Sequence, residues 1–335
     1  MSKPTIALIF SQETQAAVIS PATREAMMQT FNVLGPDKPG KVTPGQAAEW
    51  LKSADGCMTG WGSPAITPEI VKASPKLKII AHSAGTVKPY VCDAVFERNI
   101  SVTTAAPRIG LDVADYTLGI ILTAMKNTME LCPALAEGKW GHTAAMMKTP
   151  DDARGCTVGV ISASWVGKFL MKLLPAFEIK TLLYDPYVTA EQAREFNAEK
   201  VELDELFERS DVVTCHAPSI PATNHIVNGT RLAKMKKGSI FINTSRGTCV
   251  DENALVEELK KKRIWAFLDV YDPEPPPPGS PLYGCPNLTM TPHIAGSVGR
   301  GRLALGAQAY KELCAFFSGQ PVQYPVTQKM LATMA

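Results

Sequence analysis

The sequence lacks the features that mark several classes of protein. Its 335 residues carry 34 basic and 32 acidic side chains, so a net charge of +2 leaves no global field to hold a nucleic-acid backbone. No run approaches the ~18 apolar residues that a membrane span needs, and the apolar stretch at the N-terminus is too short for a signal peptide. We therefore expect a cytoplasmic protein with neither a nucleic-acid nor a membrane partner.

Patterns for metal ions and disulfides are missing as well. The eight cysteines are scattered, with no CxxC pair and no histidine at the spacing of metal ligands. We expect no metal site, and we interpret the thiols as buried and reduced. Low-complexity tracts are absent, and 45% hydrophobic with 20% charged residues is typical of a folded globular protein. The length suffices for about two domains of ~150 residues.

Short apolar runs alternate with segments of helical spacing, which predicts an α/β protein with mostly parallel sheets covered by helices. Two such series are present, and the second begins at Cys156. The expected strands are 5–10, 56–59, 78–81, 100–104, 157–161, 181–184, 212–215, 239–243, 266–270 and 288–291. The expected helices are 21–31, 67–73, 113–129, 168–176, 203–209, 231–235, 252–261 and 302–317.

Four further segments have other patterns. Residues 131–154 have weak periodicity and are expected to form a surface excursion or an arm. Residues 273–278 read PEPPPP and must form an extended loop, because proline lacks an amide donor and fixes φ. The basic runs 234–237 and 260–263 lie at the ends of expected helices, where they complement the helix dipole, and we prefer this to a nucleic-acid patch.

A possible dinucleotide-binding turn follows the expected strand 157–161. Residues 162–167 read SASWVG where such a fold has G-x-G-x-x-G, and Asp185 lies 18 residues after Gly167. Only the third glycine is kept, so a plain α/β connection is the alternative. If a dinucleotide binds, the helix N-terminus would direct its amides at the pyrophosphate. Asp185 would accept from the ribose 2′-hydroxyl, which favours NAD over NADP; alternatively it is a surface-turn aspartate.

Three pieces of the second half carry a specific resemblance. They are 243–247 (NTSRG), 269–275 (DVYDPEP) and 291–293 (TPH). In this order and spacing they closely resemble the D-isomer-specific 2-hydroxyacid dehydrogenase family, which includes phosphoglycerate dehydrogenases. Similarity extends to segments upstream, so that it covers most of the chain: 155–167, 184–186, 216–218 and, more weakly, 77–118.

The resemblance implies a fold of two Rossmann-like domains with parallel sheets. The flavodoxin-like substrate domain would be discontinuous, with residues 1–110 and 298–335, and the NAD-binding domain would comprise 111–297. The family places its active site in the cleft between the domains. It also implies a homodimer through the nucleotide domain, for which 113–129 and the arm 131–154 are the expected interface.

The resemblance also implies the chemistry, which is NAD(H)-dependent interconversion of a D-2-hydroxy acid and a 2-keto acid. Arg246 would bind the substrate carboxylate and polarise the adjacent carbonyl. His293 would be the acid/base, and Glu274 would be the carboxylate that favours its imidazolium form. The hydride would come from the nicotinamide.

Further contacts carry over from the family by position. Backbone amides of Trp165 and Val166 would face the pyrophosphate, and Asp269 would bind the nicotinamide carboxamide. The full set expected at the cofactor is Ser164, Trp165, Val166, Asp185, His216, Ala217, Pro218, Thr244, Asp269 and Gly296. Backbone amides of Ala84, Gly85 and Thr86 would form a nest for the substrate carboxylate.

Several positions depart from the family pattern, so phosphoglycerate is an unsafe substrate assignment. Lys88 stands where Asp or Asn is usual, and it either adds positive charge near the pocket or is simply solvated. Ile109, with Arg108 beside it, replaces a contacting Asn. Trp61 could cover the pocket, but packing on its own domain is preferred.

Departures at the cofactor predict weaker NAD binding than in relatives. Ser162 and Ser164 replace glycines, and Trp165 stands where Arg, Lys or Asn is frequent. The alternative function is a nucleotide-sensing or scaffold protein with weak catalysis that retains the dehydrogenase fold, although the intact catalytic trio argues against it. A formate dehydrogenase is disfavoured because that branch has glutamine at the position of Glu274. The remaining histidines are interpreted as structural: His82, His142 and His225.

Overall fold

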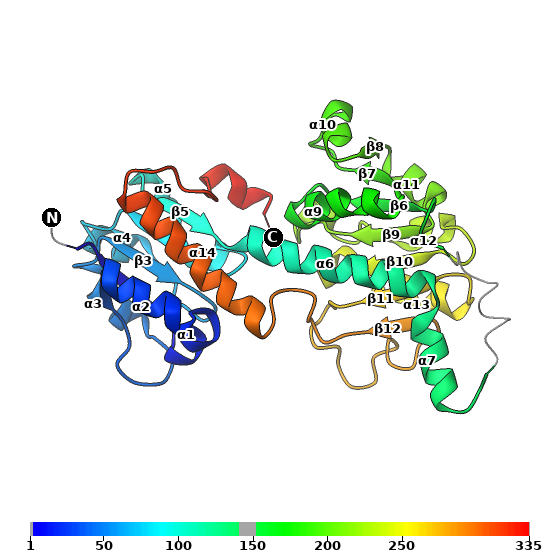
Figure 1. Ribbon diagram of the computed structural model, residues 1–335, viewed down its shortest axis with the longest axis horizontal. Coiled ribbons are helices and arrows are strands. Elements are labelled where there is room, and N and C mark those ends of the chain that lie inside the picture. Colours follow the sequence, from blue (N-terminus) through cyan, green and yellow to red (C-terminus); the bar gives the residue numbers. More distant parts are fainter. Residues whose placement is uncertain (1–2, 141–151, 335) are drawn as a thin grey trace. The chain divides into compact units, whose positions relative to one another are not determined.

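The computed structural model describes residues 3–140 and 152–334 (Figure 1). Contacts within the chain divide it into two compact units. Unit 1 comprises Met1–Ile109 and Ser297–Ala335, and unit 2 comprises Gly110–Gly296. The chain leaves unit 1 and later returns to it, so unit 2 is an insertion in the sequence of unit 1.

Unit 1 is a five-stranded parallel sheet whose order, β2-β1-β3-β4-β5, is flavodoxin-like. Its strands are β1 (Thr5–Leu8), β2 (Asn32–Leu34), β3 (Gly56–Thr59), β4 (Ile79–His82) and β5 (Ser101–Thr104). Its α-helices are α1 (Gln12–Val18), α2 (Pro21–Thr30), α3 (Pro44–Leu51), α4 (Pro68–Ala73), α5 (Asp93–Glu97) and α14 (Arg300–Phe317).

Both faces of this sheet are buried. In β1, Ile6 and Leu8 belong to one apolar cluster, whereas Ala7 belongs to another, because successive side chains of a strand point to opposite faces. Helices cover both faces, so the strands are continuous apolar runs. The returning helix α14 packs directly on α1, since a Cβ at Gly306 would overlap the carbonyl oxygen of Val18.

Unit 2 is a seven-stranded parallel sheet of order β12-β11-β10-β9-β6-β7-β8, and its order reverses between β6 and β9. Its strands are β6 (Thr157–Ile161), β7 (Lys180–Tyr184), β8 (Ala198–Lys200), β9 (Val212–Cys215), β10 (Ile240–Asn243), β11 (Trp265–Leu268) and β12 (Leu288–Met290). The helices are α6 (Ala106–Met125, which begins in unit 1), α7 (Thr128–Ala136), α9 (Trp165–Leu173), α10 (Ala190–Glu195), α11 (Leu203–Arg209), α12 (Gly229–Lys234) and α13 (Glu252–Lys260).

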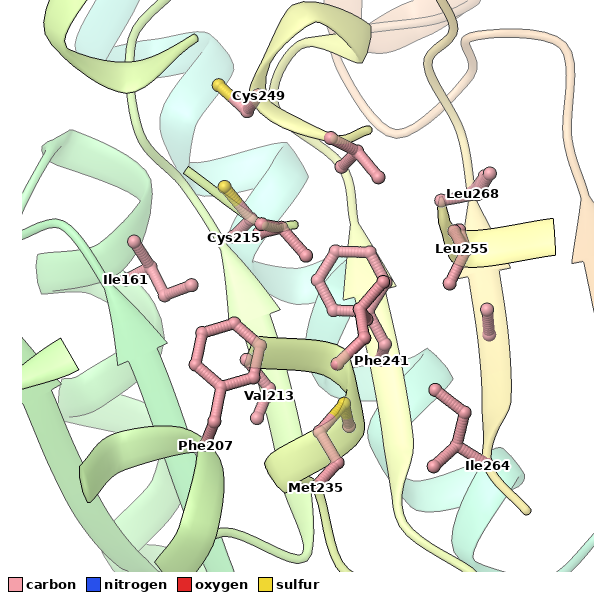
Figure 2. Packing of buried hydrophobic residues seen from close by; sticks show 14 of the residues in the cluster. Ile161, Phe207, Val213, Cys215, Met235, Phe241, Cys249, Leu255, Ile264 and Leu268 are labelled. Atoms are coloured by element: carbon pink, nitrogen blue, oxygen red, sulfur yellow. The ribbon is translucent and has the colours of Figure 1, made fainter. Parts of the chain in front are cut away.

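One apolar core of unit 2 is shown in Figure 2. Phe207 from α11 and Phe241 from β10 are fully buried in it, together with Cys215 and Cys249. Close packing on this face depends on Gly159 in β6, where a Cβ would overlap the side chain of Leu206. This core fixes the strands whose carboxyl ends carry the candidate site.

The α/β class and the parallel sheets are confirmed, and every expected strand is present with ends shifted by at most two residues. The expected helix 113–129 was wrong at both ends, because α6 begins at Ala106 and ends before Asn127, whose φ of 53° interrupts the helix. Residues 131–154 are not simply irregular, since α7 occupies their first part. Within that predicted arm, 141–151 lie outside the described residues.

Six short elements were also missed from the sequence. They are α1, β2, α3, α5, α10 and β8. Their apolar periodicity extends over too few residues to stand out, although α3 carries a capping box of Thr43 and Gln46 that could have revealed it. Among the described residues, no helix is long and apolar enough to cross a membrane.

Candidate active site

A tight turn at the carboxyl end of β10 positions Arg246. The Asn243 side-chain Nδ2 donates to the Arg246 carbonyl at 2.9 Å, and both the backbone N and Oγ of Ser245 donate to Asn243 Oδ1, at 3.0 and 2.9 Å. Gly247 is required next, because a Cβ there would overlap the backbone of Tyr271. The path of the main chain is therefore fixed on both sides of the arginine.

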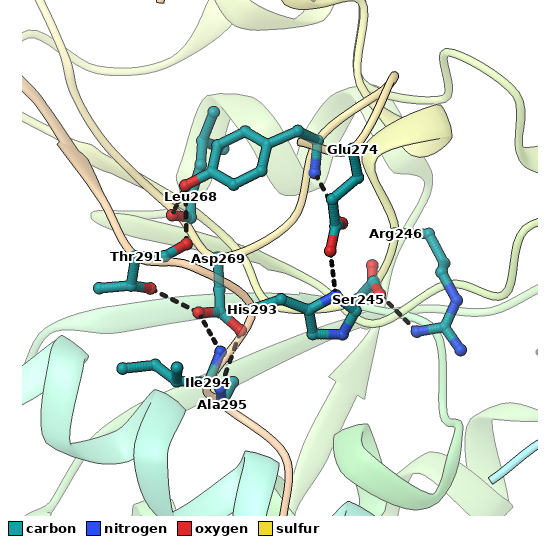
Figure 3. Close-up of polar contacts among 10 residues, drawn as sticks. Ser245, Arg246, Leu268, Asp269, Glu274, Thr291, His293, Ile294 and Ala295 are labelled. Carbon is teal, nitrogen blue, oxygen red and sulfur yellow. Dashed lines mark hydrogen bonds and ion pairs between the residues drawn. The ribbon is translucent and has the colours of Figure 1, made fainter. Parts of the chain in front are cut away.

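The Arg246 side chain is partly buried. Its Nη1 donates to the Ser245 carbonyl at 2.6 Å (Figure 3). Burial lowers the pKa of the guanidinium from its ordinary value, while the neighbouring Cys249 and Glu274 act in the opposite direction. The remaining guanidinium donors form a fork suited to a carboxylate.

His293 and Glu274 form a hydrogen-bonded pair. His293 Nδ1 lies 2.5 Å from Glu274 Oε1, and the side chains are 50% and 36% exposed (Figure 3). The contact engages Nδ1, so Nε2 is the ring nitrogen that remains for another partner. His293 has a φ of 52°, an uncommon backbone conformation for a residue other than glycine. Such local strain is frequent at functional sites.

Asp269 holds the loop that carries this histidine. Its carboxylate is fully buried, and Oδ1 accepts from Thr291 Oγ1 at 2.5 Å and Ile294 N at 2.9 Å. Oδ2 accepts from Ala295 N at 2.8 Å. The predicted contact of Asp269 with the carboxamide stays a prediction, and the structure adds that this residue fixes both sides of His293.

Tyr271 is a second support for the same loop, and sequence reasoning missed it. Its hydroxyl donates to the carbonyls of Leu268 at 3.0 Å and Thr291 at 2.8 Å. Burial, followed by the nearby Asp269 charge, raises the pKa of Tyr271 to about 12, so the phenol remains a donor. A tyrosine directly before the Asp-Pro-Glu-Pro run was the available signal.

The predicted dinucleotide turn joins β6 to α9. Ser164 is the N-cap of α9, and its hydroxyl accepts from the Gly167 amide at 3.4 Å. Gly167 packs so closely that a Cβ would overlap the carbonyl oxygen of Ser162. Trp165 begins the helix, with 43% of its surface exposed, and Val166 follows. The first amides of an α-helix have no acceptor within the helix and can face an anion.

The other predicted cofactor residues lie at the carboxyl ends of neighbouring strands. Asp185 follows β7, Thr244 follows β10, and residues 216–218 follow β9. The carboxyl ends of parallel strands share one edge, where ligands of open α/β sheets bind. Gly296 is the last residue of unit 2.

The His216 side chain is a structural element rather than a proton donor. Its ring is 3% exposed, with Nε2 3.0 Å from Thr214 Oγ1. Burial lowers its pKa to about 3, which keeps it neutral. Its Nδ1 is buried and has no hydrogen-bond partner among the described residues. Thr244 is also buried, and its hydroxyl lies 3.0 Å from that of Thr117.

In unit 1, the predicted substrate loop follows β4. Thr104 Oγ1 donates to the carbonyls of Gly85 at 2.6 Å and Ala84 at 3.3 Å, and the Lys88 amide donates to Thr86 Oγ1 at 3.3 Å. Ile109 lies against Gly85, since its Cδ1 would be 3.6 Å from an added Cβ.

Two other predictions concern unit 1. His82 is buried beneath the loop, with Nδ1 2.8 Å from Thr59 Oγ1, and burial lowers its pKa to about 4. Trp61 packs within its own unit, since the Arg302 guanidinium lies 5.6 Å from its ring, although 40% of it stays exposed. His142 lies outside the described residues. Residues 3–140 and 152–334 contain no cluster of side chains that could hold a metal ion.

The residues present fit a dinucleotide. The strand–turn–helix–strand unit ends in the carboxylate of Asp185. The Ser164 cap of α9 accepts from the Gly167 amide, and Gly167 allows α9 to approach the end of β6 closely. The site lies where the order of the sheet reverses between β6 and β9, the usual ligand position in such sheets. These features define a dinucleotide-binding α/β protein with an Arg–His–Glu group at the same edge.

Comparison with known proteins identifies the family. Residues 118–295 match the family model described as "D-isomer specific 2-hydroxyacid dehydrogenase, NAD binding domain". The chain belongs to the D-isomer-specific 2-hydroxyacid dehydrogenase family, and unit 2 is its NAD-binding domain. The resemblance stated from the sequence is thereby confirmed, and NAD(H) is the cofactor.

Relatives within this family carry several names. The chain is 33% identical to a glyoxylate reductase of Thermofilum pendens over 270 residues, which is 79% of each protein. It is also 33% identical over 262 residues to a D-3-phosphoglycerate dehydrogenase of Archaeoglobus fulgidus, but spans only 49% of that protein. The solved D-mandelate dehydrogenase of Rhodotorula graminis shares the fold, with a TM-score of 0.80, 21% identity and 98% coverage of both chains.

Proposed function

We propose that the protein interconverts a D-2-hydroxy acid and a 2-keto acid with NAD(H). The observation that carries the proposal is the His293–Glu274 pair at 2.5 Å, on the same sheet edge as Arg246. A cation for a carboxylate and a proton-transfer group oriented by a carboxylate are the protein groups that this reaction needs.

Each of the three residues has a distinct role in this proposal. Arg246 binds the substrate carboxylate through its planar fork and polarises the adjacent carbonyl. His293 gives a proton from Nε2 to the carbonyl oxygen during reduction and takes it back during oxidation. Glu274 accepts a hydrogen bond from His293 Nδ1, which fixes the orientation of the imidazole ring and stabilises its imidazolium form. The nicotinamide, when bound, supplies or accepts the hydride.

A small keto acid is a better substrate candidate than a phosphorylated one. The matched region spans only 49% and 53% of two curated phosphoglycerate dehydrogenases, which are therefore much longer than the chain. The glyoxylate and hydroxypyruvate reductases have 79% and 80% of their length covered. The substitutions at Lys88 and Ile109 also lie in the segments expected to contact the substrate.

A panel of 2-keto acids with NADH and with NADPH tests the proposal. Glyoxylate, hydroxypyruvate, pyruvate, phenylpyruvate and phosphohydroxypyruvate are supplied separately, and the loss of reduced-cofactor absorbance is followed. Reduction of one of them with NADH to the D-hydroxy acid supports the proposal. Binding of NADH without reduction of any keto acid would favour the sensor or scaffold alternative.

The second part of the proposal is a homodimer built on unit 2. The long helix α6 and the following α7 are its candidate interface, and α7 leaves Leu135 52% exposed. Apolar side chains that gather in one exposed patch mark partner surfaces, and Leu135 would lie in such a patch. Light scattering on the purified protein should give twice the chain mass, and Leu135→Glu should shift it towards one chain. A wild-type mass of one chain at all concentrations would contradict this part.

A further inference from the structure

The turn between β6 and α9 adopts a backbone conformation that its sequence does not favour. Ser162 has a φ of 81°, in the region that glycine adopts freely and L side chains rarely do. It occupies the first glycine position of the dinucleotide motif. The Ser162 amide donates to the Tyr184 carbonyl at 2.8 Å, so the conformation is anchored to the end of β7.

The Asp185 carboxylate makes hydrogen bonds directly to this turn. Only 7% of Asp185 is exposed, and Oδ2 accepts from the Ala163 amide at 2.8 Å, with a longer contact of 3.4 Å to Ser162 Oγ. Oδ1 accepts from the Tyr187 amide at 2.8 Å. The carboxylate thus bridges the turn and the chain that leaves β7. Charged acceptors on backbone amides form strong hydrogen bonds.

A displacement of the turn would be transmitted to the start of α9. The carbonyl of Ser162 lies against Gly167 with no room for a Cβ, and Ser164 caps the helix. The first amides of α9 therefore keep their position only while Ser162 keeps its own. Those amides belong to the pyrophosphate contacts expected at Trp165 and Val166.

We propose that Asp185 is a positioning residue that holds the Ser162–Ala163 turn in the conformation that binds the pyrophosphate. Its side-chain hydrogen bonds stabilise a backbone conformation that glycine, in the usual motif, adopts without support. This role is separate from any contact between Asp185 and the ribose. The inference rests on NAD(H) binding in the proposed function and predicts that removal of Asp185 weakens NADH and NADPH binding together.

A double-mutant cycle on NADH binding tests the coupling. NADH affinity is measured by fluorescence for the wild type, Asp185→Ala, Ser162→Gly and the double variant. Glycine needs no support at this φ, so the factor by which Asp185→Ala weakens NADH binding should be about fivefold smaller in the Ser162→Gly background than in the wild-type background. Equal factors in both backgrounds would overturn the inference, because a direct ribose contact alone is lost equally from each.

Lys262→Gly is the matched control. Lys262 is exposed in unit 2, has a φ of 53° and lies just before β11, so glycine there relieves a similar backbone strain away from the turn. In the Asp185→Ala background it should raise the thermal midpoint without restoring NADH binding. If Asp185→Ala alone does not fold, rescue of folding and of NADH binding by Ser162→Gly but not by Lys262→Gly supports the inference. Equal rescue by both contradicts it.

NADPH binding distinguishes this inference from a role of Asp185 in cofactor choice alone, and turnover distinguishes it from the proposed reaction. NADPH affinity should fall in Asp185→Ala together with NADH affinity, and an NADPH affinity equal to or above that of the wild type would contradict a positioning role. Turnover with keto acids is measured independently. A protein that shows the coupling in NADH binding but reduces no keto acid supports this inference and contradicts the proposed reaction.

Discussion

Two turns at the same edge of the unit 2 sheet meet similar demands on the backbone in different ways. After β10, the chain passes so close to Tyr271 that only Gly247 fits, and the sequence keeps that glycine. After β6, the chain adopts a left-handed conformation at Ser162, and a side chain from the end of β7 supports it. The turn after β10 therefore depends on the absence of a side chain at Gly247, whereas the turn after β6 depends on the side chain of Asp185.

This difference shows what a motif specifies. At the turn after β10 the sequence has glycine where the structure leaves no room for a Cβ, so the motif alone is sufficient to recognise it. At the dinucleotide turn the letters have changed from glycine to serine, while Asp185 and Gly167 preserve the geometry between β6 and α9. A weak match to a glycine pattern therefore does not exclude the structure that the pattern usually marks.

The largest expected effect is at the catalytic edge. His293→Ala should lower the turnover rate by about 10³-fold, because it would remove the proposed acid/base, whose Nδ1 lies 2.5 Å from Glu274 Oε1. NADH affinity should change by less than about twofold, since the dinucleotide turn lies elsewhere on the sheet. Steady-state kinetics and NADH fluorescence measure the two quantities. Turnover within about tenfold of the wild type would contradict the assigned role.

Gly247→Ala should be the most damaging change to stability. The added methyl would overlap the backbone of Tyr271, which cannot move without displacing the loop that leads to Glu274. We expect a loss of about 3 kcal/mol in the free energy of unfolding, measured by denaturant titration. Gly45→Ala in α3 is the control, because a Cβ there meets nothing within 4 Å and should stabilise the helix slightly. Equal stability of the two variants would be inconsistent with the close packing.

Acid should destabilise the protein through its buried histidines. Burial lowers the pKa of His82 to about 4 and of His216 to about 3, whereas an unfolded histidine titrates near 6.5. The unfolded chain therefore binds more protons between these values, so the stability present above pH ~6.5 is lost as the pH falls towards ~4. His216→Gln should reduce the slope of the unfolding free energy against pH, in this range, by the equivalent of about one proton. An unchanged slope would show that His216 is protonated in the fold.

Arg246, Glu274 and His293 could be selected as the candidate trio because they stand in short motifs of the family, and the structure places all three at one sheet edge. The supports around them could not be predicted in the same way, since the partners of a buried carboxylate depend on where the loops pass. Asp269 accepts from residues on both sides of His293, which its position after β11 does not reveal. The left-handed backbone at Ser162 was equally hidden, because residue type alone favours the opposite conformation.

Trp165→Arg is expected to have the smallest effect and addresses the dinucleotide turn directly. The exposed indole stacks on Phe169 with ring centres 5.9 Å apart and has the Lys168 ammonium 6.0 Å from its ring. Because the indole itself is uncharged, it offers no positive charge to an anion. Arginine at the first residue of α9 should tighten NADH binding about threefold at low salt, and the gain should shrink as salt rises. Trp165→Ala is the control and should change the affinity by less than about twofold, because the backbone amide is retained. If both variants bind NADH equally, the tryptophan is not what weakens the site, and the serine-substituted turn alone distinguishes it from the glycine-rich form.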